Sequence, residues 1–162
     1  HIAGLQRYIG AAMPCFAPNV NSYRRLVPYS DAPINAHWGH DNRTVGLRVP
    51  ASGAADRRVE NRLAGADANP YLAIAASLAC GLLGMQKNLP PSEPHLGTAN
   101  EDDVEVARTL EEGLRLLHRS PEVSDIFGEL FLKAYACVKL DEFEEFNRVI
   151  SSWEREHLLL QV

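Results

Sequence analysis

The spacing of apolar residues predicts a helix in residues 1–13, loops and short strands in residues 14–66, and mainly helices in residues 67–162. In the first segment apolar side chains recur at intervals of three and four, the period of an amphipathic helix: Ile2, Leu5, Ile9 and Met13. No capping residue precedes this helix, and the chain opens with His1 rather than Met. We therefore expect a fragment that begins within a helix.

The proline-rich stretch that follows is typical of loops, with strands expected near 44–49 and 57–63. The second of these reads RRVENRL. In an extended strand its charged side chains, Arg58, Glu60 and Arg62, would project from one face, roughly 6 to 7 Å apart. The residue pattern alone leaves two interpretations open, a solvated row of salt bridges or the wall of an anionic, metal-dependent site.

The second half of the sequence begins with a clear helix start. Asn69 is a good N-cap, and Pro70 suits the first helical position. The segment that follows is apolar on nearly all sides and rich in Ala and Gly, so we expect a buried helix. Beyond a proline-rich connector at 88–100, expected to be irregular and on the surface, the sequence predicts further helices: 103–118, one opened by Ser120 and Pro121, 128–150, and 153–161 after a Ser151 and Glu154 capping box.

The longest of these segments, 128–150, places Leu130, Ala134 and Val138 on one apolar stripe. Phe131 and Tyr135 lie beside this stripe, and Phe143, Phe146 and Ile150 continue it. Together with the short strands upstream, the helices predict an α+β fold.

Composition narrows the class of protein and of partner. The 162 residues, 46% of them hydrophobic and 23% charged, indicate one globular domain, and a net charge of -5 gives no reason to expect a nucleic-acid partner. The apolar run at 71–85 would be about 22 Å long as a helix, too short for a bilayer, so we expect no membrane partner. Cys15, Cys80 and Cys137 are widely spaced, which favours free thiols in core or boundary positions and a cytoplasmic location.

Candidate chemistry is concentrated before residue 65, in the stretches NSYRRLVP, SDAP, DNRTVGLRVP and RRVENRL. They contain most of the arginines in this half of the chain: Arg24, Arg25, Arg43, Arg48, Arg57, Arg58 and Arg62. The planar guanidinium group can grip carboxylate or phosphate oxygens with two hydrogen bonds, as phosphoryl transfer requires. Glu60 alone would not make a magnesium site, because Mg²⁺ needs an octahedron of oxygen ligands.

The order of five motifs resembles the glutamine synthetase superfamily, in the C-terminal part of its catalytic domain. These motifs are NSYRRLVP, AP, NR…RVP, RRVENR and DANPYLAIAASLA, and the resemblance covers His1 to Gln86. The ending WEREHLLLQV resembles the branch of γ-glutamylpolyamine (γ-glutamylputrescine) synthetases. The resemblance implies an α+β fold with an antiparallel sheet segment and a helical C-terminal layer. Residues 1–66 would carry the sheet and active-site loops, and residues 67–162 would be mainly helical.

The resemblance also implies roles for individual residues. Arg25 would hold the carboxylate end of glutamate, and Arg62 would reach glutamate and the transferring phosphoryl group. Glu60 would be a ligand of one of two divalent metal ions, magnesium or manganese. Asp31 stands where many members carry a glutamate on a flap that takes the proton from the incoming amine, and it is one methylene shorter. The arginines that would embrace the phosphates of ATP are Arg43, Arg48 and Arg58.

By this resemblance the parent protein is an ATP-dependent ligase that joins glutamate to an amine through γ-glutamyl phosphate, in a ring-like homo-oligomer. The family's other metal ligands, its nucleotide loop and its small N-terminal domain would precede His1, so we expect the fragment alone to be inactive. The alternatives are an ordinary glutamine synthetase that uses ammonia, a guanidino-kinase-like phosphotransferase with the same catalytic fold, and a non-catalytic scaffold relative. A Glu-x-Glu pair upstream of His1 would decide the class.

Overall fold

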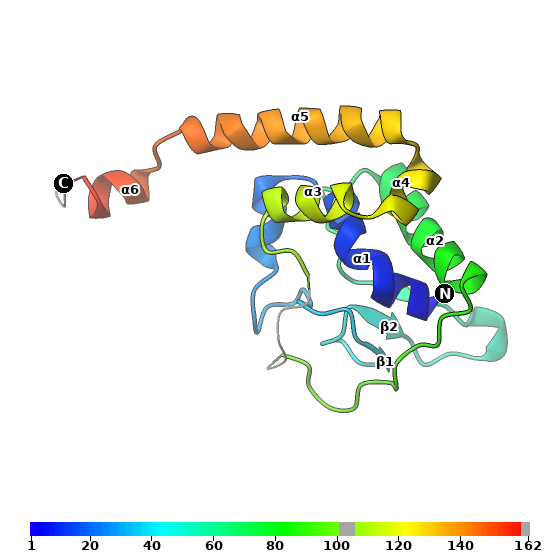
Figure 1. Cartoon of the computed structure of the whole chain (residues 1–162). Coiled ribbons are helices and arrows are strands. Elements are labelled where there is room, and N and C mark those ends of the chain that lie inside the picture. Colours follow the sequence, from blue (N-terminus) through cyan, green and yellow to red (C-terminus); the bar gives the residue numbers. More distant parts are fainter. Residues whose placement is uncertain (101–105, 160–162) are drawn as a thin grey trace.

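The computed structural model describes residues 1–100 and 106–159, and within them it contains six α-helices and one three-stranded sheet (Figure 1). The helices are α1 (Ile2–Phe16), α2 (Pro70–Gln86), α3 (Leu110–His118), α4 (Pro121–Phe127), α5 (Glu129–Arg148) and α6 (Ser152–His157). The strands are β1 (Trp38–His40), β2 (Leu47–Val49) and β3 (Glu60–Asn61). The expected α+β fold class is confirmed.

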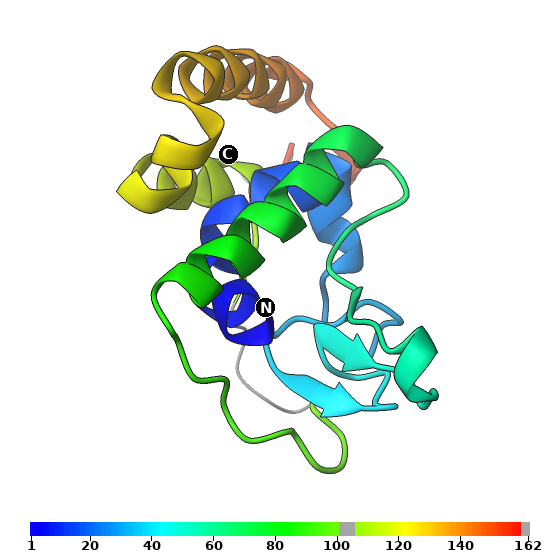
Figure 2. The same cartoon turned by 90° about the vertical axis from the view of Figure 1, so that its right-hand side faces the viewer.

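The crossing of α1 and α2 lies at the centre of the molecule, above the sheet and beneath α3 (Figures 1 and 2). The two helices meet backbone to backbone. A Cβ atom built on Gly4 would overlap the carbonyl oxygen of Cys80 and lie 2.8 Å from the backbone nitrogen of Gly84. Any side chain at this point would therefore force the helices apart.

The first helix is longer than expected. It continues past Met13, through Pro14, to Phe16. A proline inside a helix removes one backbone hydrogen bond and crowds the preceding turn, so its presence here requires compensation from packing. Pro14 is fully buried, and its carbonyl oxygen accepts a hydrogen bond of 2.7 Å from the Tyr135 hydroxyl on α5.

The second helix begins as expected but is not buried on all sides. The Asn69 side chain accepts hydrogen bonds from the first turn, and Pro70 occupies the first position. Ala76, Cys80 and Leu83 are buried in the core, whereas other apolar side chains of the helix are exposed: Tyr71, Ile74, Leu78, Leu82 and Met85. Where the two helices cross, Gly4 lies against the backbone of Cys80 and Gly84. Within the described residues no helix, α2 included, combines the length and hydropathy needed to cross a membrane.

The sheet is mixed rather than antiparallel, which corrects the expectation. β1 pairs parallel with β2, and β2 pairs antiparallel with β3, with Arg48 opposite Glu60. β1 was not anticipated. Parallel pairing is possible because both strands are short, so the loop 41–46 is long enough to return the chain to the level at which β1 begins. The chain reverses direction at Asp41, which lies in the left-handed region at φ 48°.

The third strand is shorter than the predicted strand at 57–63. In the register of the sheet, the residue opposite Arg58 is Pro50, which has no amide hydrogen to donate. Pairing therefore stops at Glu60. The expected alternation of side chains is nonetheless present, because Leu63 is fully buried and Val59 packs against the core.

The C-terminal helices follow the predicted order with changed boundaries. α3 begins at Leu110, capped by the Thr109 side chain, so residues 106–109 of the expected helix are not helical, and 103–105 lie outside the described residues. α4 starts at Pro121 as expected. The Ser151 capping box of α6 is confirmed. That helix ends at His157, and the expected residues 160–161 lie outside the described part of the chain.

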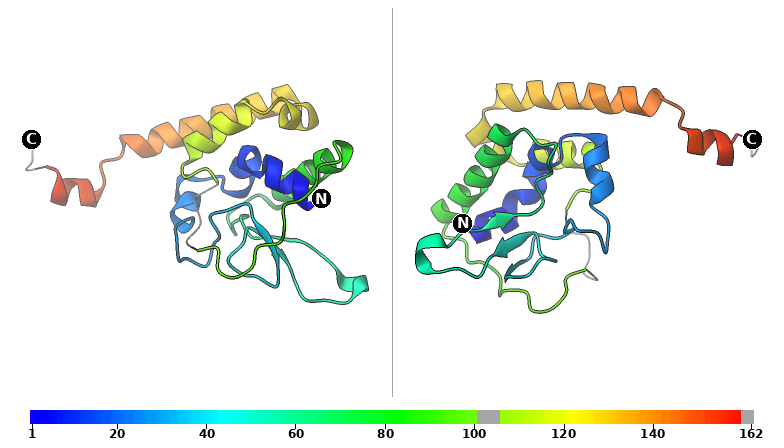
Figure 3. Two further views of the ribbon diagram at one scale, coloured as in Figure 1. Left: turned by 60° about the horizontal axis from the view of Figure 1, so that its bottom comes forward. Right: turned by 180° about the vertical axis from the view of Figure 1, so that it is seen from behind.

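On the fifth helix the apolar stripe of the sequence does not face the core. Leu130 is 82% exposed and Val138 is 57% exposed, whereas Leu132 is buried and Tyr135 and Phe143 pack against the core. Leu130 lies in the first turn of α5, but two residues along a helix turn by about 200°, so it points to the side opposite Leu132. Figure 3 shows that the second part of α5 projects beyond the other helices together with α6.

All three cysteines are free thiols. Cys15 and Cys80 are buried, and burial raises the pKa of the Cys15 thiol to about 11 and that of Cys80 to about 12. Cys137 on α5 is exposed, contrary to the expectation of a core or boundary position. The two buried thiols stay protonated and serve as packing groups.

The crossing of α1 and α2 yields a stability prediction. Gly84→Ala should lower the free energy of unfolding by about 1 to 3 kcal/mol, the usual cost of overpacking, because the new Cβ would overlap the backbone of Gly4. Gly10→Ala is the matched control within α1: no atom lies within 4 Å of its added Cβ, so Ala should stabilise by about 0.5 to 1 kcal/mol. Urea unfolding of the two variants measures both changes, and equal effects would contradict the proposed close contact.

Candidate active site

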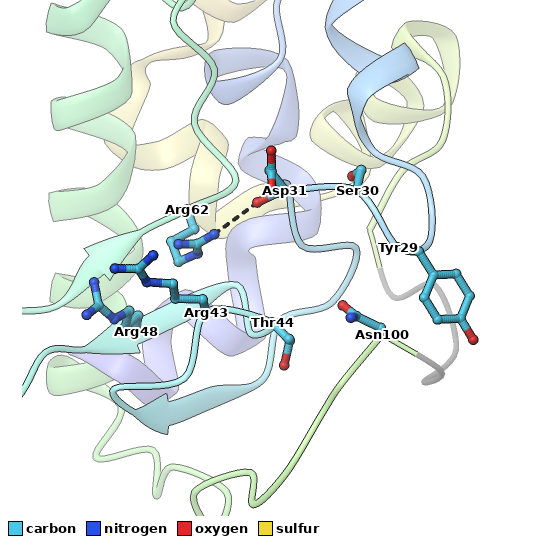
Figure 4. Close-up of a pocket in the computed structure, with 8 residues that line it drawn as sticks. All are labelled: Tyr29, Ser30, Asp31, Arg43, Thr44, Arg48, Arg62 and Asn100. Atoms are coloured by element: carbon cyan, nitrogen blue, oxygen red, sulfur yellow. Dashed lines mark hydrogen bonds between the residues drawn. The ribbon is translucent and has the colours of Figure 1, made fainter.

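A polar cavity of about 500 Å³ lies beside the sheet, and three arginines form one side of it (Figure 4). Its lining residues come from β2 and from the segments that connect the helices and strands: Tyr29, Ser30, Asp31, Arg43, Thr44, Arg48, Arg62 and Asn100. Figure 4 shows the side chains of Arg43, Arg48 and Arg62 gathered close together, with Tyr29 and Asn100 on the opposite side. The structure thus brings together four of the residues singled out from the sequence, these arginines and Asp31.

Arg48 is the most firmly held of the three. It extends from β2 directly opposite Glu60 on β3, and its guanidinium group donates to the Glu60 carboxylate at 2.9 Å. It also makes an ion pair with Asp41. The hydrogen bond from Arg48 lowers the pKa of Asp41, and the bonds to Asp41 and then Glu60 raise the pKa of Arg48. Arg48 is therefore fixed in the charged state between two carboxylates.

Arg62 connects the sheet to the loop that contains Asp31. Its backbone amide donates to the carbonyl oxygen of Gly46 at 2.9 Å, which extends the pairing of β2 and β3. Its side chain donates to the carbonyl oxygen of Asp31, also at 2.9 Å (Figure 4). The contact is with the backbone of Asp31, so it places this residue at the cavity without pairing its carboxylate.

Two of the three arginines that line the cavity have a hydrogen-bond donor without a partner, as does Arg25 outside it. The Nε atoms of Arg48 and Arg62 are buried, and neither has a hydrogen-bond partner within the described residues. Buried donors are normally satisfied, and guanidinium groups bind phosphate and carboxylate oxygens well. This donor set, with a net excess of positive charge in the cavity wall, fits an anionic ligand such as the phosphates of ATP.

The other predicted site residues lie around the cavity rather than in it. Arg58 is 57% exposed and reaches Glu60 only at 3.9 Å. Arg25 does not line the cavity, because its guanidinium group donates to the backbone carbonyl oxygen of Leu63. Burial lowers the pKa of Arg25, and the nearby charge of Asp67 partly opposes this. In this structure Arg25 therefore supports the turn after β3.

The donor set for a divalent metal ion is incomplete. Glu60 is paired with Arg48, and nowhere in residues 1–100 and 106–159 do three His, Cys, Asp or Glu side chains come together as metal ligands. Mg²⁺ and Mn²⁺ require several oxygen ligands. The described residues therefore supply one candidate ligand and do not form a metal site by themselves.

Five residues at or beside the cavity were not identified from the sequence: Tyr29, Ser30, Asp41, Thr44 and Asn100. Tyr29 and Ser30 directly precede Asp31, and Thr44 directly follows Arg43, so the motifs could have drawn attention to them. Asn100 comes from the end of the connector, and only the tertiary structure brings it to the cavity. Asp41 opens the stretch DNRTVGLRVP, but nothing in the sequence pairs it with Arg48.

Comparison with known proteins decides the family. Residues 1–158 match the glutamine synthetase catalytic domain, which is nearly the whole chain. The chain belongs to the glutamine synthetase family. The resemblance inferred from the five motifs is thereby confirmed, and the arginine-lined cavity is the candidate active site of a member of this family.

The relatives include ligases of several amines. The chain is 40% identical to a glutamate–isopropylamine ligase from a Pseudomonas species over 94% of this chain and 34% of that protein. It is 39% identical to the γ-glutamylputrescine synthetase of Escherichia coli over 98% of this chain and 34% of that protein. A glutamine synthetase from Methanosarcina mazei is 32% identical over 98% of this chain and 38% of that protein. The chain thus spans about a third of the length of these relatives.

The incomplete metal site yields a binding prediction. Because Glu60 is the one candidate ligand among the residues that the structure describes and is already paired with Arg48, the 162-residue chain should bind Mg²⁺–ATP more weakly than the micromolar range. Isothermal titration measures this directly. Glu60→Gln is the control and should leave the weak binding unchanged, whereas micromolar affinity that Glu60→Gln abolishes would show that this chain builds a metal site alone.

Proposed function

We propose that this chain is the C-terminal part of the catalytic domain of an ATP-dependent ligase, which joins glutamate to an amine through γ-glutamyl phosphate. The observation that supports it best is the cavity in which Arg43, Arg48 and Arg62 converge while two buried Nε donors lack partners. A phosphoryl group in transfer carries negative charge that such donors stabilise. The ligases and synthetases among the relatives agree with this chemistry.

Each residue then has a proposed role. Arg43 and Arg48 hold the phosphates of ATP, with Arg58 reaching them from the rim. Arg62 contacts the transferring phosphoryl group and glutamate. Asp31, which Arg62 holds through its backbone, takes a proton from the amine. Arg25 would have to release the carbonyl oxygen of Leu63 before it could bind the glutamate carboxylate.

The remaining parts of the site belong, in this proposal, to the two thirds of the ligase that the chain does not span. These are further ligands for magnesium or manganese, the nucleotide loop and an N-terminal domain. The described chain would contribute Glu60 as one metal ligand. The division into residues 1–66, with the sheet and active-site loops, and residues 67–162, mainly helical, is part of the proposal. So are a cytoplasmic location and a ring-like homo-oligomer.

The assignment of Arg62 can be tested in the full-length ligase. Arg62→Ala should lower kcat on the order of 10²-fold or more, because it removes a donor that stabilises charge in the transition state. Arg62→Lys should restore little, since an ammonium group cannot make the paired hydrogen bonds of a guanidinium group. Phosphate release with glutamate and an amine is the measurement.

Arg148→Ala is the matched control, because Arg148 lies on the exposed side of α5 and, among the described residues, pairs with its neighbours Glu144 and Glu145 alone. Its activity should equal that of the unaltered enzyme. Full activity in Arg62→Ala would contradict the proposed role. Activity on a guanidine acceptor instead of glutamate would favour the phosphotransferase alternative, and a protein inactive with every acceptor would favour a scaffold.

For the acceptor, we propose a primary alkylamine or diamine rather than ammonia. Three relatives bear the names of isopropylamine, putrescine and ethanolamine ligases. In addition, Asp31 is one methylene shorter than glutamate, which leaves room that ammonia does not need and an alkylamine could fill. A carboxylate at this position favours a cationic acceptor and can remove its proton once it is bound.

Competing acceptors test this choice. With glutamate and ATP fixed, kcat/KM for putrescine, spermidine, ethanolamine and isopropylamine should exceed that for ammonium. Asp31→Glu should shift the preference toward ammonium, because the longer side chain fills the added space. A clear preference of the unaltered enzyme for ammonium would indicate ordinary glutamine synthesis.

A further inference from the structure

The three arginines of the cavity differ in what holds them. Arg48 is fixed by two carboxylates, and Arg62 by the carbonyl oxygen of Asp31. For the guanidinium group of Arg43, the described part of the chain supplies no hydrogen bond or ion pair. Its direction therefore depends on the backbone of the loop 41–46 that carries it.

Asn42 fixes this loop locally. Its Oδ1 atom accepts hydrogen bonds from the backbone amide of Thr44 at 2.9 Å and from the Thr44 hydroxyl at 2.7 Å. Bonds of an asparagine side chain to the residue two positions on close a tight turn. The turn brackets Arg43, so the two residues on either side of it are locked to each other.

The same two residues bind the loop to a distant segment. Residues 92–99, which we call the strap, run beside the sheet (Figure 1), and the residue that follows them, Asn100, lines the cavity. The Nδ2 atom of Asn42 donates to the carbonyl oxygen of Gly97 at 2.8 Å, and the backbone amide of Ala99 donates to the Thr44 hydroxyl at 2.9 Å. The Thr44 hydroxyl donates to Asn42 and accepts from Ala99, which joins loop and strap in one network.

The backbone of the strap is shaped for this contact. Gly97 has φ 84°, a conformation that residues with a side chain rarely adopt. The strap also passes so close to β1 that a Cβ on Gly39 would lie 3.0 Å from the carbonyl oxygen of His95. Directly after the strap, Asn100 reaches the cavity wall. The strap therefore supports the Arg43 loop and forms part of the cavity.

We propose that Asn42 is a positioning residue for Arg43, and that it acts by locking the loop to the strap. The proposal deepens the function proposed above and rests on it for the role of Arg43. The amide of Asn42 is suited to the task because it provides two acceptor bonds to the turn and one donor bond to the strap. Loss of this amide lets the loop, and with it the guanidinium group of Arg43, change direction.

The kinetic test uses the full-length ligase. Asn42→Ala should raise KM for ATP by roughly 10- to 150-fold, the range for the loss of one hydrogen bond to a charged group, and change kcat by less than about 3-fold. The double variant with Arg43→Ala should be no worse than Arg43→Ala alone, since both act through one group. Asn42→Asp keeps the acceptor bonds to Thr44 but loses the donor to Gly97, so KM should stay raised. An unchanged KM in Asn42→Ala, additive losses, or full rescue by Asp would overturn the proposal.

Gln6→Ala is the matched control at the other end of the strap. Gln6 exchanges hydrogen bonds of 2.9 and 3.1 Å with Ser92, so its removal also loosens the strap but leaves the Asn42 turn intact. KM for ATP should not change in this variant. If KM for ATP rises as much in Gln6→Ala as in Asn42→Ala, any loosening of the strap weakens ATP binding, and the hydrogen bonds of Asn42 have no special role.

A second measurement does not depend on ligase activity. Amide hydrogen exchange on the 162-residue chain should show protection at Ala99 that Asn42→Ala removes and Gln6→Ala retains. Unchanged protection of Ala99 in Asn42→Ala would contradict the proposal that Asn42 holds the loop to the strap. If Asn42→Ala loses protection at Ala99 but Arg43→Ala leaves KM for ATP unchanged, Asn42 does hold the loop to the strap. The proposed role of Arg43 in binding ATP would then be the part that is wrong.

Discussion

The contact between Gly4 and Gly84 sets the distance between α1 and α2, and the packing of the rest of the molecule depends on it. Because no side chain separates the helices there, the buried face of α1 can reach α2 on one side and α3 and the sheet on the others. Residues of all these elements, from Leu5 to Leu117, form one continuous apolar core. A wider crossing would open voids along the whole of this core, since protein interiors tolerate few empty spaces.

The core also determines which side chains reach the cavity. Leu47 and Leu63 are fully buried, and each is the neighbour in sequence of an arginine that lines the cavity, Arg48 and Arg62. Successive side chains of a strand point to opposite faces, so burying the leucines turns both arginines outward. A register shift by one residue would expose the leucines and bury two charges, which makes the arrangement of the site a direct consequence of core packing.

Features with a local cause could be predicted from the sequence, and features that depend on distant neighbours could not. The start of α2 at Asn69 and Pro70 and the capping box at Ser151 follow from short-range hydrogen bonding, and they were correct. The exposure of Leu130 could not be predicted because it depends on which face of α5 packs against the other helices. The motifs indicated four cavity residues, but the pairing of Arg48 with Asp41 and the arrival of Asn100 require the folded chain.

The strap has a consequence for the order in which the chain folds. Its contacts join residues 86 positions apart at Gln6 and Ser92, and 55 apart at Asn42 and Gly97. Closing such long loops costs entropy before the new hydrogen bonds repay it, so contacts of this kind form late. The helix starts and the β2–β3 pair are local and can form early. We therefore expect the Arg43 loop to reach its final shape in the last stage of folding, after the hydrophobic core is complete.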